Sequence, residues 1–296
     1  MTPRPLHLHL VAIGGTGMAP LACLLQAQGH FVTGSDGALY PPMSELLEGA
    51  GIQPWQGYTA DHLAPAPDAV IIGNAVRRDN PEAVEAERLG LPRLSMPEAL
   101  ARFFLADRRP LVIAGTHGKT TTSAMAAWAW SQCGRDPGFL VGGVPLDLEV
   151  SFRAGSGPRF VIEGDEYNAS YFDRGAKFLH YRPETLILTS VEYDHADLYP
   201  SPQALLDAYA RLIALVPDSG LIVACGDSAE VRALAAAARA PVVFYGEDES
   251  NAVRLLGAPV ADTSGIRFRL REESGEEVEL AMPVWGVHNA VNALAV

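Results

Sequence analysis

Lysine is nearly absent from this sequence. Of its 22 lysines and arginines, only two are lysines, Lys119 and Lys177. Acidic residues outnumber basic ones, and the formal net charge is -13. Nucleic-acid binding requires a basic surface against the phosphate backbone, so we expect no nucleic-acid partner. Small anionic ligands are not excluded, because backbone N–H groups and one or two cations can hold them.

Cysteines and long apolar runs are also scarce. The three cysteines are far apart and form no C-x-x-C pair, which argues against a disulfide framework and a cysteine zinc site. We find no apolar stretch long enough to cross a bilayer and no signal-peptide pattern, so we expect a cytoplasmic protein with no membrane partner. With 296 residues, 48% of them hydrophobic, the chain can build two packed domains.

The first part of the sequence alternates strand and helix patterns. Strands are expected at 8–13, 30–35 and 69–73, and helices at 18–28, 81–89 and 97–104. A glycine turn joins the first strand to the first helix and completes a βαβ unit. The charged segment 106–110 ends the last helix, so we predict a Rossmann-like domain over residues 1–107.

A second α/β pattern follows, and we predict a P-loop-type ATP-binding domain over residues 108–296. Its expected strands are at 111–114, 139–141, 160–163, 185–189, 221–224 and 242–245, with helices at 202–215 and 228–239. Such alternation favours a mainly parallel sheet covered on both faces. The alternating tail at 253–282 predicts a small antiparallel addition.

The most informative motif joins the strand at 111–114 to an alanine-rich helix. It reads Gly115, Thr116, His117, Gly118, Lys119, Thr120, Thr121. A glycine turn before a helix directs backbone N–H groups and the helix dipole at an anion, and Lys119 adds a positive charge. The loop is a short variant, because the longer P-loop spacing would require glycine at Ile113. An ordinary glycine turn is the alternative, but the lysine and threonines favour a nucleoside triphosphate, with Thr120 facing Mg²⁺.

Acidic residues follow two apolar strands. Glu163 begins the run Glu-Gly-Asp-Glu-Tyr at 163–167, and His195 lies in the acidic run 192–197. Ligands bind at the carboxyl ends of parallel strands, and Mg²⁺ selects hard oxygen donors, so Glu163 is a metal candidate. His195 is a candidate metal ligand or acid–base group. A solvated acidic turn and a structural histidine are the alternatives.

Two further motifs are weaker taken alone. The amino-terminal turn at 15–20 resembles a dinucleotide-binding turn with its third glycine replaced by Pro20, and Asp36 ends the next strand, where it could hold a ribose. A turn that serves packing alone is the alternative. Near the end of the sequence, His288 and Asn292 are four residues apart on an expected helix and share one face. Asparagine amides there could meet an adenine edge, although a capped helix start fits equally.

Taken together and in this order, the motifs resemble the Mur ligase family, ATP-dependent enzymes that join amino acids or peptides to UDP-N-acetylmuramate. Within the family, Asp165-Glu166-Tyr167, followed by Phe-Asp at 172–173, Lys-Phe at 177–178 and His-Tyr at 180–181, looks like the members that ligate the murein tripeptide L-Ala-γ-D-Glu-meso-diaminopimelate in peptidoglycan recycling. Members that add L-alanine are the alternative.

The resemblance implies a set of roles. Catalysis would depend on Lys119, Glu163 and His195, and Mg²⁺ would be held by Thr120, Glu163 and His195. ATP would be bound by Gly115, Thr116, His117, Gly118, Lys119, Thr120, Thr121, His288, Asn289 and Asn292. UDP-N-acetylmuramate would be bound by Gly14, Gly15, Thr16, Gly17, Met18, Ser35 and Asp36. A carbamoylated lysine bridges the metals in several members, but no lysine follows Lys177, so another ligand or water is expected there.

The resemblance also sets expectations about activity. The family has a third, carboxy-terminal domain that brings the incoming amine, and we expect it to be absent from a chain that stops at Val296. Such a chain would bind its substrates and turn over poorly. A nucleotide-binding module without ligase activity is an alternative of another class. An NAD-dependent oxidoreductase would explain only the amino-terminal turn.

Overall fold

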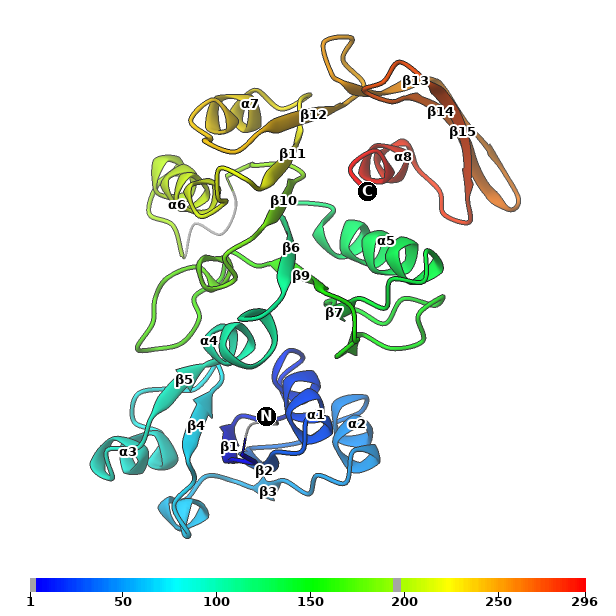
Figure 1. Cartoon of the computed structure of the whole chain (residues 1–296). Helices are drawn as coiled ribbons and strands as arrows, with labels where there is room; N and C mark the ends of the chain where they lie inside the picture. Colours follow the sequence, from blue (N-terminus) through cyan, green and yellow to red (C-terminus); the bar gives the residue numbers. More distant parts are fainter. Residues whose placement is uncertain (1–3, 194–197) are drawn as a thin grey trace.

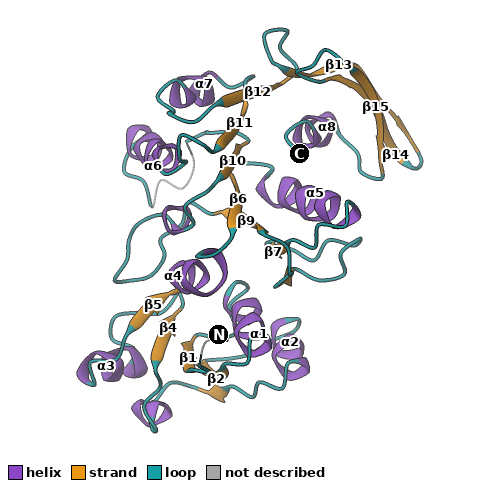
Figure 2. Cartoon of the chain, in the orientation of Figure 1, coloured by secondary structure: helices purple, strands orange, loops and turns teal. Residues whose placement is uncertain are grey.

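The computed structural model describes residues 4–193 and 198–296, which form two sheets with helices packed against them (Figure 1). Figure 2 shows the alternation of strands and helices along the chain. The α/β class predicted from the sequence is confirmed, with one wholly parallel and one mixed sheet.

The first sheet has the order β3-β2-β1-β4-β5, and all its strands are parallel. Its strands are β1 (His7–Val11), β2 (Phe31–Asp36), β3 (Trp55–Gln56), β4 (Ala69–Ile72) and β5 (Arg93–Ser95). Its helices are α1 (Met18–Ala27), α2 (Met43–Gly49), η1 (Ala60–Leu63), α3 (Pro81–Arg88), α4 (Met96–Leu100) and the π-helical turn η2 (Ala101–Leu105).

The second sheet has ten strands in the order β15-β14-β13-β12-β11-β10-β6-β9-β7-β8. Its strands are β6 (Arg109–Ala114), β7 (Gly138–Leu140), β8 (Phe152–Arg153), β9 (Arg159–Gly164), β10 (Thr185–Leu188), β11 (Leu221–Cys225), β12 (Val242–Gly246), β13 (Val253–Asp262), β14 (Gly265–Arg271) and β15 (Glu277–Met282). Its helices are α5 (Lys119–Gln132), η3 (Lys177–His180), α6 (Pro202–Ala214), α7 (Ala229–Ala235) and α8 (Val287–Ala293). The central strands are parallel, and β13 to β15 form the predicted antiparallel addition.

Three details differ from the sequence-based prediction. The helix expected at 228–239 ends at Ala235. The helix expected at 97–104 divides into α4 and η2, where a capping box at Ser95 fixes the start of α4. The short elements α2, β3 and β5 carry no clear periodicity, and we did not predict them.

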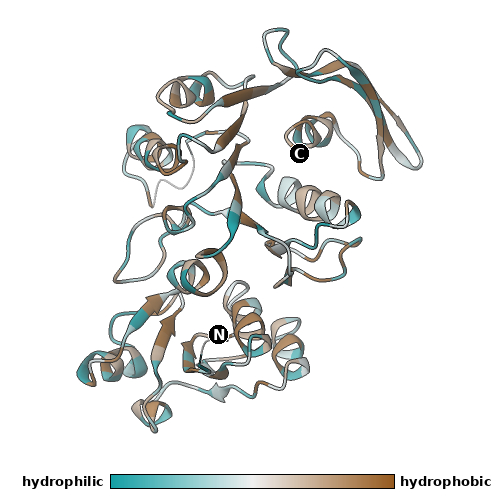
Figure 3. Ribbon diagram, in the orientation of Figure 1, coloured by the Kyte–Doolittle hydropathy of each residue, from teal (hydrophilic) through white to brown (hydrophobic). Residues whose placement is uncertain are grey.

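The burial of the strands explains why the apolar runs in the sequence predicted them correctly. The residues of β4 and the central strands of the second sheet are buried on both faces, so they read as continuous apolar runs (Figure 3). Helix α1 is buried from Met18 to Leu25, because it packs between the first sheet and the helices near it. No helix of the described residues has the length and hydrophobicity that a bilayer crossing requires.

Candidate functional site

The carboxyl ends of β6 and β9 bring the predicted phosphate loop and the acidic run together. These strands are parallel neighbours, with Ile113 opposite Glu163 and Ala114 opposite Gly164. Strand β10 pairs with β6 on its other side. The loop after β6 therefore lies between the loops after β9 and β10, at the edge where ligands bind in parallel α/β sheets.

The loop itself depends on two glycines with left-handed or extended positive φ angles. Gly118, with φ 81°, caps α5, and Gly115 has φ 139°. A side chain on Gly115 would collide with the hydroxyl of Thr189 and lie 2.7 Å from the carbonyl oxygen of Ser190. The β10 loop also fixes the turn, because the backbone N–H of His117 donates to the Ser190 hydroxyl at 3.0 Å.

Lys119 lies at the first turn of α5 and is held by two kinds of oxygen. Its ammonium donates to the carbonyl oxygen of Gly115 at 2.5 Å and to the carboxylate of Glu166 at 3.0 Å. Glu166 is only 3% exposed and Lys119 17%, so this is a largely buried ion pair. The ammonium group therefore faces the loop backbone, where a bound phosphate would be in reach.

Thr120 and Glu163 contact each other beside this pair. The Thr120 hydroxyl donates to the Glu163 carboxylate at 3.2 Å, and the backbone N–H of Gly142 donates to the other carboxylate oxygen at 2.8 Å. Burial raises the pKa of Glu163, although the hydrogen bonds from Gly142 and Thr120 and the charge of Lys119 oppose that shift. A half-buried carboxylate with little counter-charge and a neighbouring hydroxyl form a hard-oxygen pair suited to Mg²⁺.

His195, the third predicted metal ligand, lies outside the described residues. The segment that leads to it is attached to the phosphate loop, because the backbone N–H of Glu192 donates to the Thr116 hydroxyl at 2.8 Å. The His117 ring lies 3.6 Å from the Glu192 carboxylate, with both side chains largely exposed. The expected roles of His195 stay predictions.

Helix α8 reaches the same loop from the far end of the sequence. The amide of Asn292 lies against Gly118, since a side chain at that glycine would be 2.7 Å from its oxygen. The amide of Asn289 donates to the carbonyl oxygen of Trp285 at 2.7 Å, which ties the start of the helix to the segment before it. His288 is exposed one turn before Asn292. The two asparagines predicted to meet a nucleotide thus lie beside the loop and at the helix start respectively.

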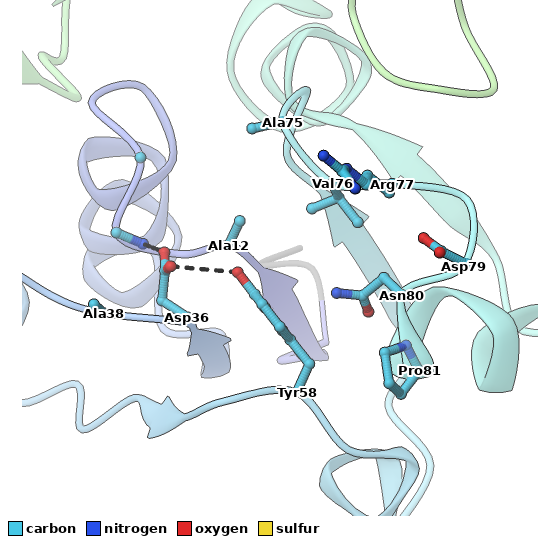
Figure 4. A pocket seen from close by; sticks show the side chains of 12 residues that line it. Ala12, Asp36, Ala38, Tyr58, Ala75, Val76, Arg77, Asp79, Asn80 and Pro81 are labelled. Atoms are coloured by element: carbon cyan, nitrogen blue, oxygen red, sulfur yellow. Dashed lines mark hydrogen bonds between the residues drawn. The ribbon is translucent and has the colours of Figure 1, made fainter.

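A hollow of about 590 Å³ lies in the first sheet's part of the molecule, at the carboxyl ends of β1, β2 and β4 (Figure 4). It is lined by Gly14, Gly15 and Asp36 among others, and we call it the glycine-turn pocket. The Asp36 carboxylate accepts hydrogen bonds from the backbone N–H groups of Gly14 at 2.8 Å and Gly37 at 2.7 Å. The hydroxyl of Tyr58 donates to it at 3.3 Å. Asp36 therefore holds the predicted turn in place from within the pocket.

Three other predicted residues lie elsewhere. Ser35 is fully buried, and its hydroxyl donates to the Glu82 carboxylate at 2.5 Å. Met18 is 5% exposed and packs in the core. Gly17 begins α1 and would meet the side chain of Met96 if it carried a side chain. The lining of the glycine-turn pocket includes none of these three residues.

Sequence reasoning missed two contributions. Glu166 was part of a noted run but was given no role, whereas the structure pairs it with Lys119. Residues 75–77 and 79–81 line the glycine-turn pocket opposite Asp36, and they are not predicted from the sequence. Their position after a fully buried strand, β4, was the available signal, because loops at that edge face ligands.

Two family models match the chain. The model described as "Mur ligase family, catalytic domain" matches residues 7–108, and the one described as "Mur ligase middle domain" matches residues 113–296.

Curated relatives from *Escherichia coli* and *Haemophilus influenzae* are both UDP-N-acetylmuramate--L-alanyl-gamma-D-glutamyl-meso-2,6-diaminoheptandioate ligases. The first is 49% identical over 74% of this chain and 48% of its own length, and the second 38% identical over 97% and 63%. A UDP-N-acetylmuramate--L-alanine ligase from *Arthrobacter* is 39% identical over 98% of this chain and 59% of its own length. The chain thus spans about half to two thirds of the length of these relatives.

Solved structures agree with these matches. The UDP-N-acetylmuramate:L-alanyl-gamma-D-glutamyl-meso-diaminopimelate ligase from *Neisseria meningitidis* has a TM-score of 0.90 and 36% identity, and covers 99% of this chain and 92% of that chain. The murein peptide ligase from *Psychrobacter arcticus* has a TM-score of 0.88 and 35% identity, and covers 98% of this chain and 64% of that chain. The chain belongs to the Mur ligase family, whose members are ATP-dependent ligases that form C–N bonds in peptidoglycan synthesis.

Proposed function

We propose that this chain supplies the ATP and UDP-N-acetylmuramate sites of a cytoplasmic ligase that attaches the murein tripeptide to UDP-N-acetylmuramate. One observation carries the proposal. Lys119, Thr120 and Glu163 meet at the carboxyl ends of β6 and β9, within hydrogen-bond distance of the loop or of each other. A generic glycine turn would not require a largely buried lysine and a half-buried carboxylate at the same edge.

The residues of this edge would divide the work on ATP. Backbone N–H groups of the loop and the start of α5 would hold the phosphates, and Lys119 would exchange its bond to Glu166 for the β and γ phosphates. Asn292, which lies against Gly118, would border the nucleotide. Thr120 and Glu163 fit Mg²⁺ as hard oxygen donors, and the ion would neutralise charge as ATP approaches the acceptor carboxylate.

The reaction that these groups support has two steps. The lactyl carboxylate of UDP-N-acetylmuramate attacks the γ-phosphorus of ATP, the bond to the β–γ bridging oxygen breaks, and ADP leaves with an acyl phosphate formed. The amine of the incoming peptide then attacks the acyl carbon, phosphate leaves, and the amine loses a proton. Activation is necessary because a carboxylate is a poor electrophile, and fixed cations stabilise the charge that collects there.

The glycine-turn pocket would take the uridine diphosphate. Asp36 faces this pocket while it holds Gly14 and Gly37, so it could reach a ribose hydroxyl without moving the turn. The backbone of Gly14 and Gly15 lines the same hollow and can approach a phosphate closely.

The choice of tripeptide as acceptor is supported by the run at 165–181 and by the 49% identity to a relative whose name specifies that peptide. L-Alanine is the second candidate, since ligases named for alanine are up to 40% identical to this chain. A nucleotide-binding part without activity of its own is the candidate of another class.

Titration calorimetry on the 296-residue chain tests the proposal, with a non-hydrolysable ATP analogue plus Mg²⁺ and, separately, with UDP-N-acetylmuramate. We expect both to bind. Lys119→Gln should lose the ATP analogue but retain the sugar nucleotide, which also shows that the variant is folded. Lys177→Gln is the matched control, because Lys177 pairs with Asp165 at 2.7 Å and not with the loop. It should bind both ligands like the wild type.

Failure of UDP-N-acetylmuramate to bind the wild-type chain contradicts the proposed donor. The acceptor is decided by mass spectrometry of products formed with ATP, UDP-N-acetylmuramate and equimolar tripeptide and alanine. Accumulation of the alanine product alone contradicts the tripeptide assignment.

A further inference from the structure

A cavity of about 680 Å³ lies between the loop after β4 and the loop 165–176 that follows β9. Four arginines line it, and we call it the arginine pocket: Arg77, Arg78, Arg93 and Arg174, beside Tyr171 and Phe172. Among the residues that the structure describes, Glu87 is the only acidic one in its lining. In a chain with a net charge of -13, this is a concentrated positive site.

Three of the four guanidinium groups are available for a ligand. Arg93 pairs with Glu87 at 3.1 Å and lies 5.7 Å above the ring centre of Phe172. Within residues 4–193 and 198–296, Arg77, Arg78 and Arg174 make no ion pair with a carboxylate. Guanidinium groups are suited to bidentate contacts with carboxylate or phosphate, so such a group of them would attract an anion.

The two walls of the arginine pocket are fixed to each other by side-chain packing. Tyr171, from the loop 165–176, packs against the apolar cluster of the first sheet that contains Val76. The tip of that loop is closed by hydrogen bonds from the backbone N–H of Ser170 to the carbonyl oxygen of Asp173 at 2.9 Å. Asp173 in turn contacts the His180 ring at 2.7 Å. Arg174 therefore lies in a turn that these contacts hold in place.

The arginine pocket adjoins both proposed sites. Arg77 lines the glycine-turn pocket, where Figure 4 labels it, and it also lines the arginine pocket. The loop 165–176, which carries Arg174, also contains Glu166, the partner of Lys119. Tyr171 is five positions after Glu166 in the sequence, a reach of at most about 18 Å. A substrate bound at either proposed site could extend a charged group into this pocket.

We propose that the arginine pocket binds an oxyanion group of a substrate, and this rests on the proposed function. Two groups have the required chemistry. They are the free carboxylates of the peptide acceptor and the diphosphate of the sugar nucleotide, which would extend from the glycine-turn pocket past the shared Arg77. Either would be held by charge-assisted hydrogen bonds from Arg78 and Arg174, which line this pocket and not the glycine-turn pocket.

The test compares the double variant Arg78→Gln/Arg174→Gln with the double control Arg88→Gln/Arg239→Gln. The control removes the same charge from exposed arginines that line neither pocket. Each chain is titrated calorimetrically with UDP-N-acetylmuramate, with tripeptide in the presence of the ATP analogue, and with inorganic pyrophosphate, at low and high salt.

We expect the pocket variant to bind one of the two substrates at least about tenfold more weakly than the control. Its salt dependence should also fall, because fewer charge pairs remain to be screened. Loss of sugar-nucleotide affinity identifies the diphosphate, and loss of tripeptide affinity identifies the carboxylates.

Equal affinities of the pocket variant and the control for both substrates and for pyrophosphate would overturn the proposal while the proposed function stands. If the wild-type chain binds neither substrate, the proposed function and the oxyanion site are both overturned. Binding of the ATP analogue, which lies at a different edge, reports that each variant is folded.

Discussion

Glu82 provides a test of how the first sheet holds its shape beneath the glycine-turn pocket. It lies in the first turn of α3, fully buried, and its carboxylate contacts three side chains. The Ser35 hydroxyl donates to it at 2.5 Å, His62 lies at 2.6 Å and His9 at 3.2 Å. Burial acts to raise the pKa of Glu82, but the hydrogen bonds from His9, Ser35 and His62 outweigh it, so the pKa is lowered.

The substitution Glu82→Gln removes the charge and keeps the size. A hydrogen bond to a charged group contributes about 1 kcal/mol more than a neutral one, so three such bonds set an upper estimate of about 3 kcal/mol. Burial of the charge offsets part of this, and we expect a loss of about 1–2 kcal/mol in the free energy of unfolding. Glu82→Ala also leaves the three partner side chains without this carboxylate, and it should lower the free energy of unfolding by about 3–5 kcal/mol.

Trp55 offers a local probe, because its ring stacks on that of His62 with centroids 4.7 Å apart. Urea unfolding would be followed by fluorescence in a background where the other three tryptophans are phenylalanine. A folded pKa below the unfolded one means that the stabilisation is present above the ordinary glutamate pKa. The gap between wild type and Glu82→Gln should therefore close as pH falls below about 4.3. A Gln variant that is more stable than wild type at neutral pH would refute the reasoning.

Three further outcomes follow from the sites. Gly115→Ala should lower the free energy of unfolding, measured with urea, by about 3 kcal/mol, because the new methyl group collides with Thr189. In the control Gly29→Ala the methyl group meets nothing within 4 Å, and the loss should be about 1 kcal/mol. Glu163→Gln should weaken Mg²⁺-dependent binding of the ATP analogue about tenfold or more. Glu163→Gln should also raise the urea midpoint at neutral pH. The pKa of Glu163 is higher in the folded than in the unfolded state, so its charged form opposes folding. An unchanged midpoint together with unchanged binding contradicts both the metal-binding role and the destabilising charge of Glu163. Asp36→Ala should weaken UDP-N-acetylmuramate binding about tenfold in calorimetry, because the hydrogen bonds to the turn are lost, and should leave the ATP analogue unaffected.

The sequence predicted the longer strands of both sheets because buried strands appear as apolar runs, whereas the short strands β3 and β5 carry no such pattern. It placed Gly115 and Lys119 at a strand–helix junction for the same reason. It could not predict which carboxylate pairs with Lys119. That depends on the register of β6 against β9 and on the turn after Gly164, which brings Glu166 to the ammonium group while Glu163 faces Thr120.

Sites formed by two distant segments were also out of reach. Arg78 and Arg174 are almost a hundred residues apart, and neither belongs to a recognisable motif. Their meeting depends on Tyr171 packing against the first sheet, a contact between elements of different sheets. Local patterns carry no information about such contacts, whereas a helix or strand is specified by its own residues.

The charges at the phosphate loop explain why a bound triphosphate would need a divalent cation there. The carboxylates of Glu163 and Glu166 lie beside the single ammonium group of Lys119, so the edge is already negative before a triphosphate arrives. Lys177 does not compensate, because it is paired with Asp165. A triphosphate would therefore be repelled unless it brought a cation, and the oxygens of Thr120 and Glu163 are placed to receive that cation. Lys119 would then be released from Glu166 towards the phosphates, so that nucleotide and metal should bind cooperatively, each weakly without the other.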